Sequence, residues 1–69
     1  MTTARHLTLT TARLIDGRWY AGSEHGHDLR TAHRRVQELT MMYPGRLAAE
    51  VWRGSTEIAT FDSESGWSK

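Results

Sequence analysis

The sequence predicts an α+β fold in which two strands, one helix and two further strands follow one another in a single small domain, residues 1–69. Three observations carry this prediction. Apolar residues recur at helical spacing over residues 28–43, an Asp-Gly pair separates two apolar runs at residues 16–17, and two further apolar runs flank Gly54. We therefore expect an antiparallel sheet of about four strands, with the amphipathic helix packed across one face.

The first two strands are predicted around residues 7–20. Leu7 and Leu9 alternate with threonines, and β-branched residues favour extended structure. Asp16 and Gly17 then give the strongest short-range hairpin signal, because both central positions of a type I′ turn need positive φ. This turn predicts the pairs Ile15 with Arg18, Leu14 with Trp19 and Arg13 with Tyr20.

A polar, glycine-containing stretch at residues 21–27 is expected to be a flexible connection to the helix. Asp28 is the expected N-cap, since its carboxylate can accept from the free amides of the first turn. Pro44 and Gly45 should end the helix. The apolar residues of this stretch fall within an arc of roughly 80°, as expected for an amphipathic helix packed on a core, and are Leu29, Ala32, Val36, Leu39 and Tyr43.

The second hairpin is expected over residues 46–61, with Gly54 and Ser55 in the turn. In that register Val51 faces Ile58, and Ala49 faces Thr60. The opposite face then carries Trp52, Ala48, Ala59 and Phe61 together with Glu50 and Glu57. Because one helix can cover only one face, we expect Trp52 and Phe61 on the uncovered side.

The two ends, residues 1–5 and 62–69, have the polar composition of flexible tails. Trp67 stands out in the second tail. A tryptophan there either folds back onto the sheet or contacts a partner, because its ring buries a large apolar area in either case.

Size and composition favour self-association. A chain of 69 residues without cysteine has no disulfide or Cys-based zinc site to stabilise a small core. Residues 1–46 carry a net charge of +3 and residues 47–69 a net charge of −2, which would suit head-to-tail contact between copies. No stretch is long and apolar enough to span a membrane, and the N-terminus lacks the apolar core of a signal peptide, so we expect a cytoplasmic protein.

Functional candidates come from residues that local stability does not explain. Arg30 lies in the first helical turn, where the helix dipole disfavours a cation, and Arg34 repels it at the i+4 position. Met41 and Met42 cannot both reach the core from adjacent helical positions, and exposed Met beside Arg is typical of protein interfaces. The predicted binding residues are Arg30, Arg34, Met41, Trp52 and Trp67, for a protein partner and a homodimer.

Two alternatives remain open. A nucleic-acid site would use Arg30, Arg34 and Arg35 against phosphates with Trp19 as a stacking group, although a net charge of +1 is a small footprint for such a ligand. A metal site would use His25, His27 and His33, with no cysteine or spaced carboxylate to support it. The chain contains no recognisable catalytic motif and none that implies a cofactor, so we expect a protein that is not an enzyme.

The order of strands and helix resembles that of small antitoxin-like or phage-encoded modulator domains. In such domains a sheet dimerises and one face binds a target. The resemblance rests on element order alone, and it implies a regulatory, protein-binding role.

Overall fold

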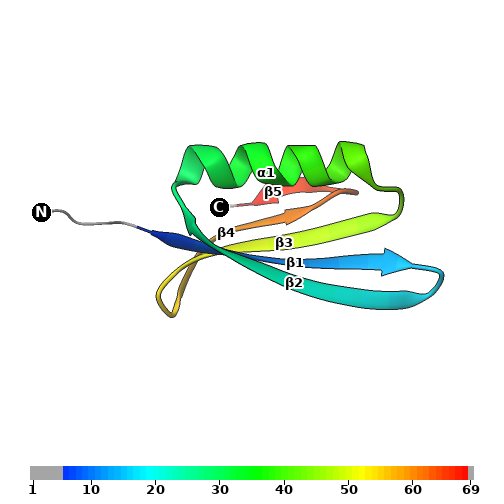
Figure 1. The fold of residues 1–69 in the computed structure, drawn as a ribbon, viewed down its shortest axis with the longest axis horizontal. Helices are drawn as coiled ribbons and strands as arrows, with labels where there is room; N and C mark the ends of the chain where they lie inside the picture. Colours follow the sequence, from blue (N-terminus) through cyan, green and yellow to red (C-terminus); the bar gives the residue numbers. More distant parts are fainter. Residues whose placement is uncertain (1–5, 69) are drawn as a thin grey trace, which may run out of the picture.

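The computed structural model describes residues 6–68 and confirms the α+β fold, with one helix packed across one face of an antiparallel sheet (Figure 1). The sheet has five strands in the order β2-β1-β3-β4-β5. In chain order the elements are β1 (Leu7–Ile15), β2 (Arg18–His27), α1 (Leu29–Met42), β3 (Arg46–Arg53), β4 (Thr56–Asp62) and β5 (Gly66–Ser68).

The β1–β2 hairpin has the predicted turn and register. Asp16 and Gly17 both have positive φ, 52° and 80°, as a type I′ turn requires. The pairs Ile15–Arg18, Leu14–Trp19 and Arg13–Tyr20 are all present. The expected loop at residues 21–27 is wrong, because β2 continues to His27. Its polar side chains are tolerated in a strand because β2 lies at the sheet edge, and positive φ at Gly26 (84°) accommodates the irregular register near its end.

The helix begins and ends as predicted. Asp28 is the N-cap, and its carboxylate accepts a 2.8 Å hydrogen bond from the Thr31 amide, while the Thr31 hydroxyl accepts from the Asp28 amide. Tyr43 is the C-cap, and Gly45 follows with φ 99°. A side chain at Gly45 would collide with the backbone carbonyl of Leu14, so this corner needs glycine for space as well as for conformation.

The last turn of α1 has no basic residue of its own, and Arg13 of β1 supplies the cation instead. The Arg13 guanidinium donates to the Leu39 carbonyl at 3.0 Å and to the Tyr43 and Pro44 carbonyls at 3.4 Å. It also lies 4.8 Å from the centre of the Tyr43 ring. The Leu39 carbonyl also accepts from the Tyr43 amide, so Arg13 adds a charged donor at the negative end of the helix and joins the helix to the sheet.

The β3–β4 hairpin keeps the predicted turn at Gly54 and Ser55 but changes register within two pairs. Arg53 pairs with Thr56 and Trp52 with Glu57, after which Ile58 is the extra residue of a bulge. Beyond it, the pairs are Val51–Ala59 and Ala49–Phe61, so the predicted pairs Val51–Ile58 and Ala49–Thr60 are wrong. A one-residue shift exchanges the faces of a strand, so Ala59 and Phe61 lie on the helix side of the sheet.

The C-terminal residues were expected to form a tail, and the structure differs for residues 62–68. Asp62 ends β4, a turn follows, and β5 pairs Phe61 with Trp67. Ser63 secures the turn, because its amide donates to the Leu47 carbonyl at 2.8 Å and its hydroxyl accepts from the Leu47 amide at 3.0 Å. Trp67 therefore folds back onto its own sheet. The other expected tail residues, 1–5 and 69, lie outside the described part of the chain.

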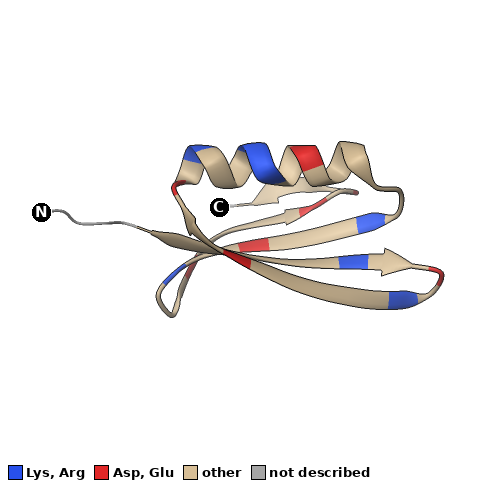
Figure 2. Ribbon diagram, viewed as in Figure 1, with Lys and Arg blue, Asp and Glu red and all other residues tan. Residues whose placement is uncertain are grey.

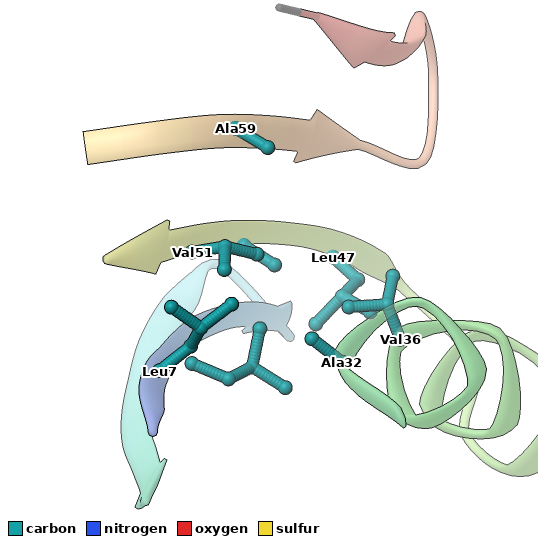
Figure 3. Close-up of a cluster of buried hydrophobic side chains, with 8 residues drawn as sticks. Leu7, Ala32, Val36, Leu47, Val51 and Ala59 are labelled. Atoms are coloured by element: carbon teal, nitrogen blue, oxygen red, sulfur yellow. The ribbon is translucent and has the colours of Figure 1, made fainter. Parts of the chain in front are cut away.

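The core is a single layer of small and medium-sized side chains between α1 and the sheet. Figure 3 shows Ala32 and Val36 of α1 meeting Leu47 of β3, with Leu7 and Val51 beside them. The buried apolar residues are Leu7, Leu9, Ala32, Val36, Leu47, Ala49, Val51 and Ala59. No aromatic residue belongs to this set, so the large rings of the described residues lie on or near the surface.

We expect Leu9→Ala to lower the free energy of unfolding by about 2–5 kcal/mol, because Leu9 is fully buried and its loss leaves a cavity. Urea denaturation followed by circular dichroism measures the change. Leu29 and Tyr43 belong to the predicted apolar arc of the helix, but they lie at its two ends and are 47% and 48% exposed. Leu29→Ala is therefore the matched control and should lose much less. Equal losses at the two positions would contradict this description of the core.

Candidate functional site

The strongest candidate site is a groove on the helix side of the sheet. The backbone of α1 lies close to the strands β1, β2 and β3 but not to β4 or β5. The outer two strands therefore extend past the helix. Between α1 and these strands lies an open groove of about 350 Å³. It is lined by His33, Val36, Gln37, Thr40 and Met41 of the helix and by Phe61 and Trp67 of the strands.

Three rings form one wall of the groove. The Trp67 ring lies 5.1 Å from that of Phe61, with the planes tilted by 52°, and 4.2 Å from the imidazole of His33, in an edge-to-face arrangement at 64°. Trp67 is nevertheless 38% exposed, and Met41, which also lines the groove, is 78% exposed. The groove therefore presents apolar surface that is held in place but not covered.

Two arginines lie beside this apolar surface. Arg30 and Arg34 continue the i, i+4 and i+7 row that leads to Gln37 and Met41, so they flank the groove on its solvent side. Both are exposed, and neither forms a salt bridge with another described residue. Asp28 is the acidic residue nearest to Arg30 in the chain, and its carboxylate is engaged at the N-cap. Its pKa is held below the usual value chiefly by the Thr31 amide, with a smaller contribution from Arg30.

The structure thus brings four of the five predicted binding residues to one side of the molecule, namely Arg30, Arg34, Met41 and Trp67. Trp52 is separate. It pairs with Thr8 on β1, whose even-numbered residues face away from the helix, and its indole N–H donates to the Thr10 hydroxyl at 3.3 Å. Trp52 is half-buried there and does not line the groove. Phe61, predicted on the uncovered face, lies in the groove instead, and this correction follows from the bulge at Ile58.

Sequence reasoning missed the roles of His33 and Phe61. The sequence offers His33 as a possible metal ligand, whereas in the structure its ring contacts Trp67. One signal was present: Asp62-Ser63-Glu64-Ser65-Gly66 has the composition of a turn, and it separates two aromatic residues that a hairpin would bring together. Reading these residues as a turn would have placed Trp67 beside Phe61.

The residues of the nucleic-acid alternative are not gathered on one surface. Arg35 lies on the opposite flank of α1 from Arg30, where its Nε donates to Glu24 at 2.9 Å and its Nη1 to Glu38 at 3.4 Å. Trp19 pairs with Leu14 and shares its face, which points away from the helix. Arg30 and Arg34 remain the only residues of that set beside the groove.

The three histidines of the metal alternative have separate partners. Nδ1 of His25 lies 3.1 Å from the Thr8 hydroxyl, and Nε2 of His27 lies 2.9 Å from the Glu24 carboxylate. His33 contacts Trp67. Among residues 6–68, no three histidine, aspartate or glutamate side chains are grouped so as to hold a metal ion.

Comparison with protein-family models, with curated proteins and with solved structures finds no match to this chain. Within the part of the chain described, no helix is both long enough and apolar enough to cross a bilayer.

Glu24 joins β2 to the helix, and this contact predicts a pH dependence of stability. Burial raises the pKa of Glu24, but the hydrogen bonds from His27 and Arg35 outweigh it and hold the pKa below its ordinary value of 4.5. A carboxylate with a lowered folded-state pKa stabilises the fold fully above its unfolded pKa, and this contribution is lost as the pH falls through the folded-state value.

We therefore expect Glu24→Gln to reduce the difference in unfolding free energy between pH 7 and pH 3 by up to about 1 kcal/mol, a small value because the pair is one-third exposed to solvent. Urea titrations at the two pH values test this. Glu38→Gln is the control, because Glu38 is more exposed and its contact with Arg35 is longer. An unchanged pH dependence in Glu24→Gln would show that the carboxylate contributes nothing to the fold.

Proposed function

We propose that this chain is a small non-enzymatic interaction protein that binds a segment of another protein in the groove between α1 and β5, and that it acts as a homodimer in the cytoplasm. The observation that supports the proposal best is the exposed, ordered Trp67. Its ring is held by Phe61 and His33 within a groove that is still open to solvent.

An ordered aromatic side chain is a favourable binding surface for two reasons. Tryptophan, methionine and arginine are enriched at protein interfaces, and all three types meet at or beside this groove. In addition, the contacts with Phe61 and His33 fix the Trp67 ring before a partner arrives, so little side-chain entropy remains to be lost on binding.

The charges beside the groove define the chemistry of the partner. Arg30 and Arg34 have no salt bridge with a described residue, so they can meet carboxylates of a bound segment without first breaking a contact. The groove of about 350 Å³ has room for large apolar side chains. We therefore expect a segment that carries aromatic or aliphatic side chains for the groove and neighbouring Asp or Glu residues for the two arginines.

Selection of a random peptide library on the immobilised full chain tests this proposal. We expect the enriched peptides to combine aromatic or aliphatic residues with Asp or Glu. Met41→Glu should weaken their binding at least about tenfold. The new carboxylate would be desolvated against the apolar side chains of the bound peptide, and it would repel the acidic residues of that peptide. Met42→Glu is the matched control, since Met42 is the adjacent residue, is 58% exposed and does not line the groove.

Two results would reject the groove. One is the absence of any enriched peptide, and the other is equal binding of the enriched peptides to the Met41→Glu and Met42→Glu variants. Circular dichroism of both variants separates loss of binding from loss of fold.

A single-stranded oligonucleotide of mixed sequence tests the competing ligand class. For a protein-binding groove we expect no retention at physiological salt. Tight binding whose log K falls steeply with log salt, and which is lost in the double variant Arg30→Glu, Arg34→Glu, would replace the protein ligand with nucleic acid.

A further inference from the structure

The edge strand β2 is a second unpartnered surface. It lies at the edge of the sheet opposite to β5 and the groove. It forms the outer strand beyond β1, and its far side faces solvent (Figure 1). Figure 2 shows no charged residue along β2 between Arg18 and Glu24. Exposed edge strands are normally protected from pairing by lysine, proline or short length, and the middle of β2 has none of these.

The turn determines which backbone groups face outward. A two-residue type I′ turn is closed by a hydrogen-bonded pair, here Ile15 and Arg18, and hydrogen-bonded pairs then recur at every second residue. Tyr20, Gly22 and Glu24 consequently direct their N–H and C=O groups toward β1. The backbone groups of Trp19, Ala21 and Ser23 point away from it and are open to another strand.

The side chains of β2 are self-complementary about Ala21. When β2 meets a second β2 in antiparallel orientation with Ala21 opposite Ala21, the outward backbone groups pair with one another. Arg18 then lies opposite Glu24 of the second copy, whose carboxylate also accepts from His27 and Arg35 of its own copy. Each large ring also lies opposite a small residue, with Tyr20 facing Gly22 and Trp19 facing Ser23 of the second copy.

A shift of this register by one residue would place residues whose N–H and C=O groups point outward opposite residues whose groups point toward β1, so the hydrogen bonds between the two copies could not form. Moving the register by two would place Arg18 opposite Gly22 or Gly26 and lose both charge pairs. A twofold interface needs one patch that fits itself, and among these registers the pairing centred on Ala21 gives the charge and size match.

We propose that two copies of this chain associate through β2, antiparallel and centred on Ala21, to form one continuous sheet. This inference deepens the homodimer part of the proposed function and is independent of the groove. The two helices would lie on the same face of the joined sheet. The two grooves would lie at its outer ends beside each β5, so that both remain open for partner segments.

Sedimentation analysis of the full chain over a concentration series, combined with Ala21→Pro, tests the interface. Proline removes an outward N–H that β1 does not use, so the monomer should keep its circular dichroism spectrum. We expect the wild type to dimerise and Ala21→Pro to weaken dimerisation at least about tenfold, since each copy loses a hydrogen bond and gains a steric clash. Ala21→Thr retains the N–H and serves as the control that should still dimerise.

Single-cysteine variants test the register, because the natural chain contains no cysteine. In the proposed pairing, the Cα atoms of the two Ala21 residues are about 5.5 Å apart, within disulfide range, whereas those of Tyr20 or Gly22 and their copies exceed about 7 Å. We expect mild oxidation to cross-link Ala21→Cys, with little cross-linking of Tyr20→Cys or Gly22→Cys.

A monomeric wild type at high concentration would overturn both this interface and the homodimer. A dimer that survives Ala21→Pro, or that cross-links best at another position, would overturn the β2 interface and its register while leaving the homodimer in place. Peptide binding to the groove is measured separately and bears on neither result.

Discussion

A single helix is narrower than the five-stranded sheet, and this difference determines which part of the sheet is covered. A helix with its side chains is about 10 Å wide, and neighbouring strands are about 4.8 Å apart, so α1 can cover two or three strands. It lies over β1, β2 and β3, and the buried core is confined to that region and to Ala59 beside it. The remaining part of the helix-side face, on β4 and β5, has only side chains to cover it. The groove is the region that these side chains leave open.

The bulge at Ile58 matters because it decides which side chains reach that region. Without the extra residue, Phe61 would face away from the helix, and Trp67 opposite it would follow to the same side. With the bulge, both rings lie on the helix side, where His33 extends the stack to α1. One irregular pair in the β3–β4 hairpin therefore converts two exposed aromatic residues into one ordered wall.

The parts of the fold that the sequence predicts are those specified by short-range chemistry. Asp28 caps the helix through an amide three residues away, and Asp16 and Gly17 adopt the φ values that their turn type requires. The β4 register, the length of β2 and the strand β5 depend instead on pairing with distant residues. The polar composition of residues 21–27 and 62–68 favours loops locally, and pairing with β1 and β4 overrides that preference.

The candidate site shows the same division. Arg30, Arg34 and Met41 are identifiable from sequence because each is unfavourable or unnecessary for an isolated helix. Their proximity to Trp67 is not identifiable, because it depends on β5 and on the face that Phe61 occupies. Trp52 shows that a large aromatic residue does not by itself identify a binding site. It is as large and as unexpected as Trp67, yet it packs against the opposite face and donates to Thr10.

The contacts of Arg13 with the end of α1 have a consequence for how the chain folds. The last helical turn lacks a basic residue, and the cation that lies against its carbonyl end comes from a strand 26 residues earlier in the chain. A peptide comprising the helix alone would therefore fray at its C-terminal end, because helix nucleation is costly and this end has no local cation. Docking of β1 therefore stabilises the last turn of the helix as well as the sheet.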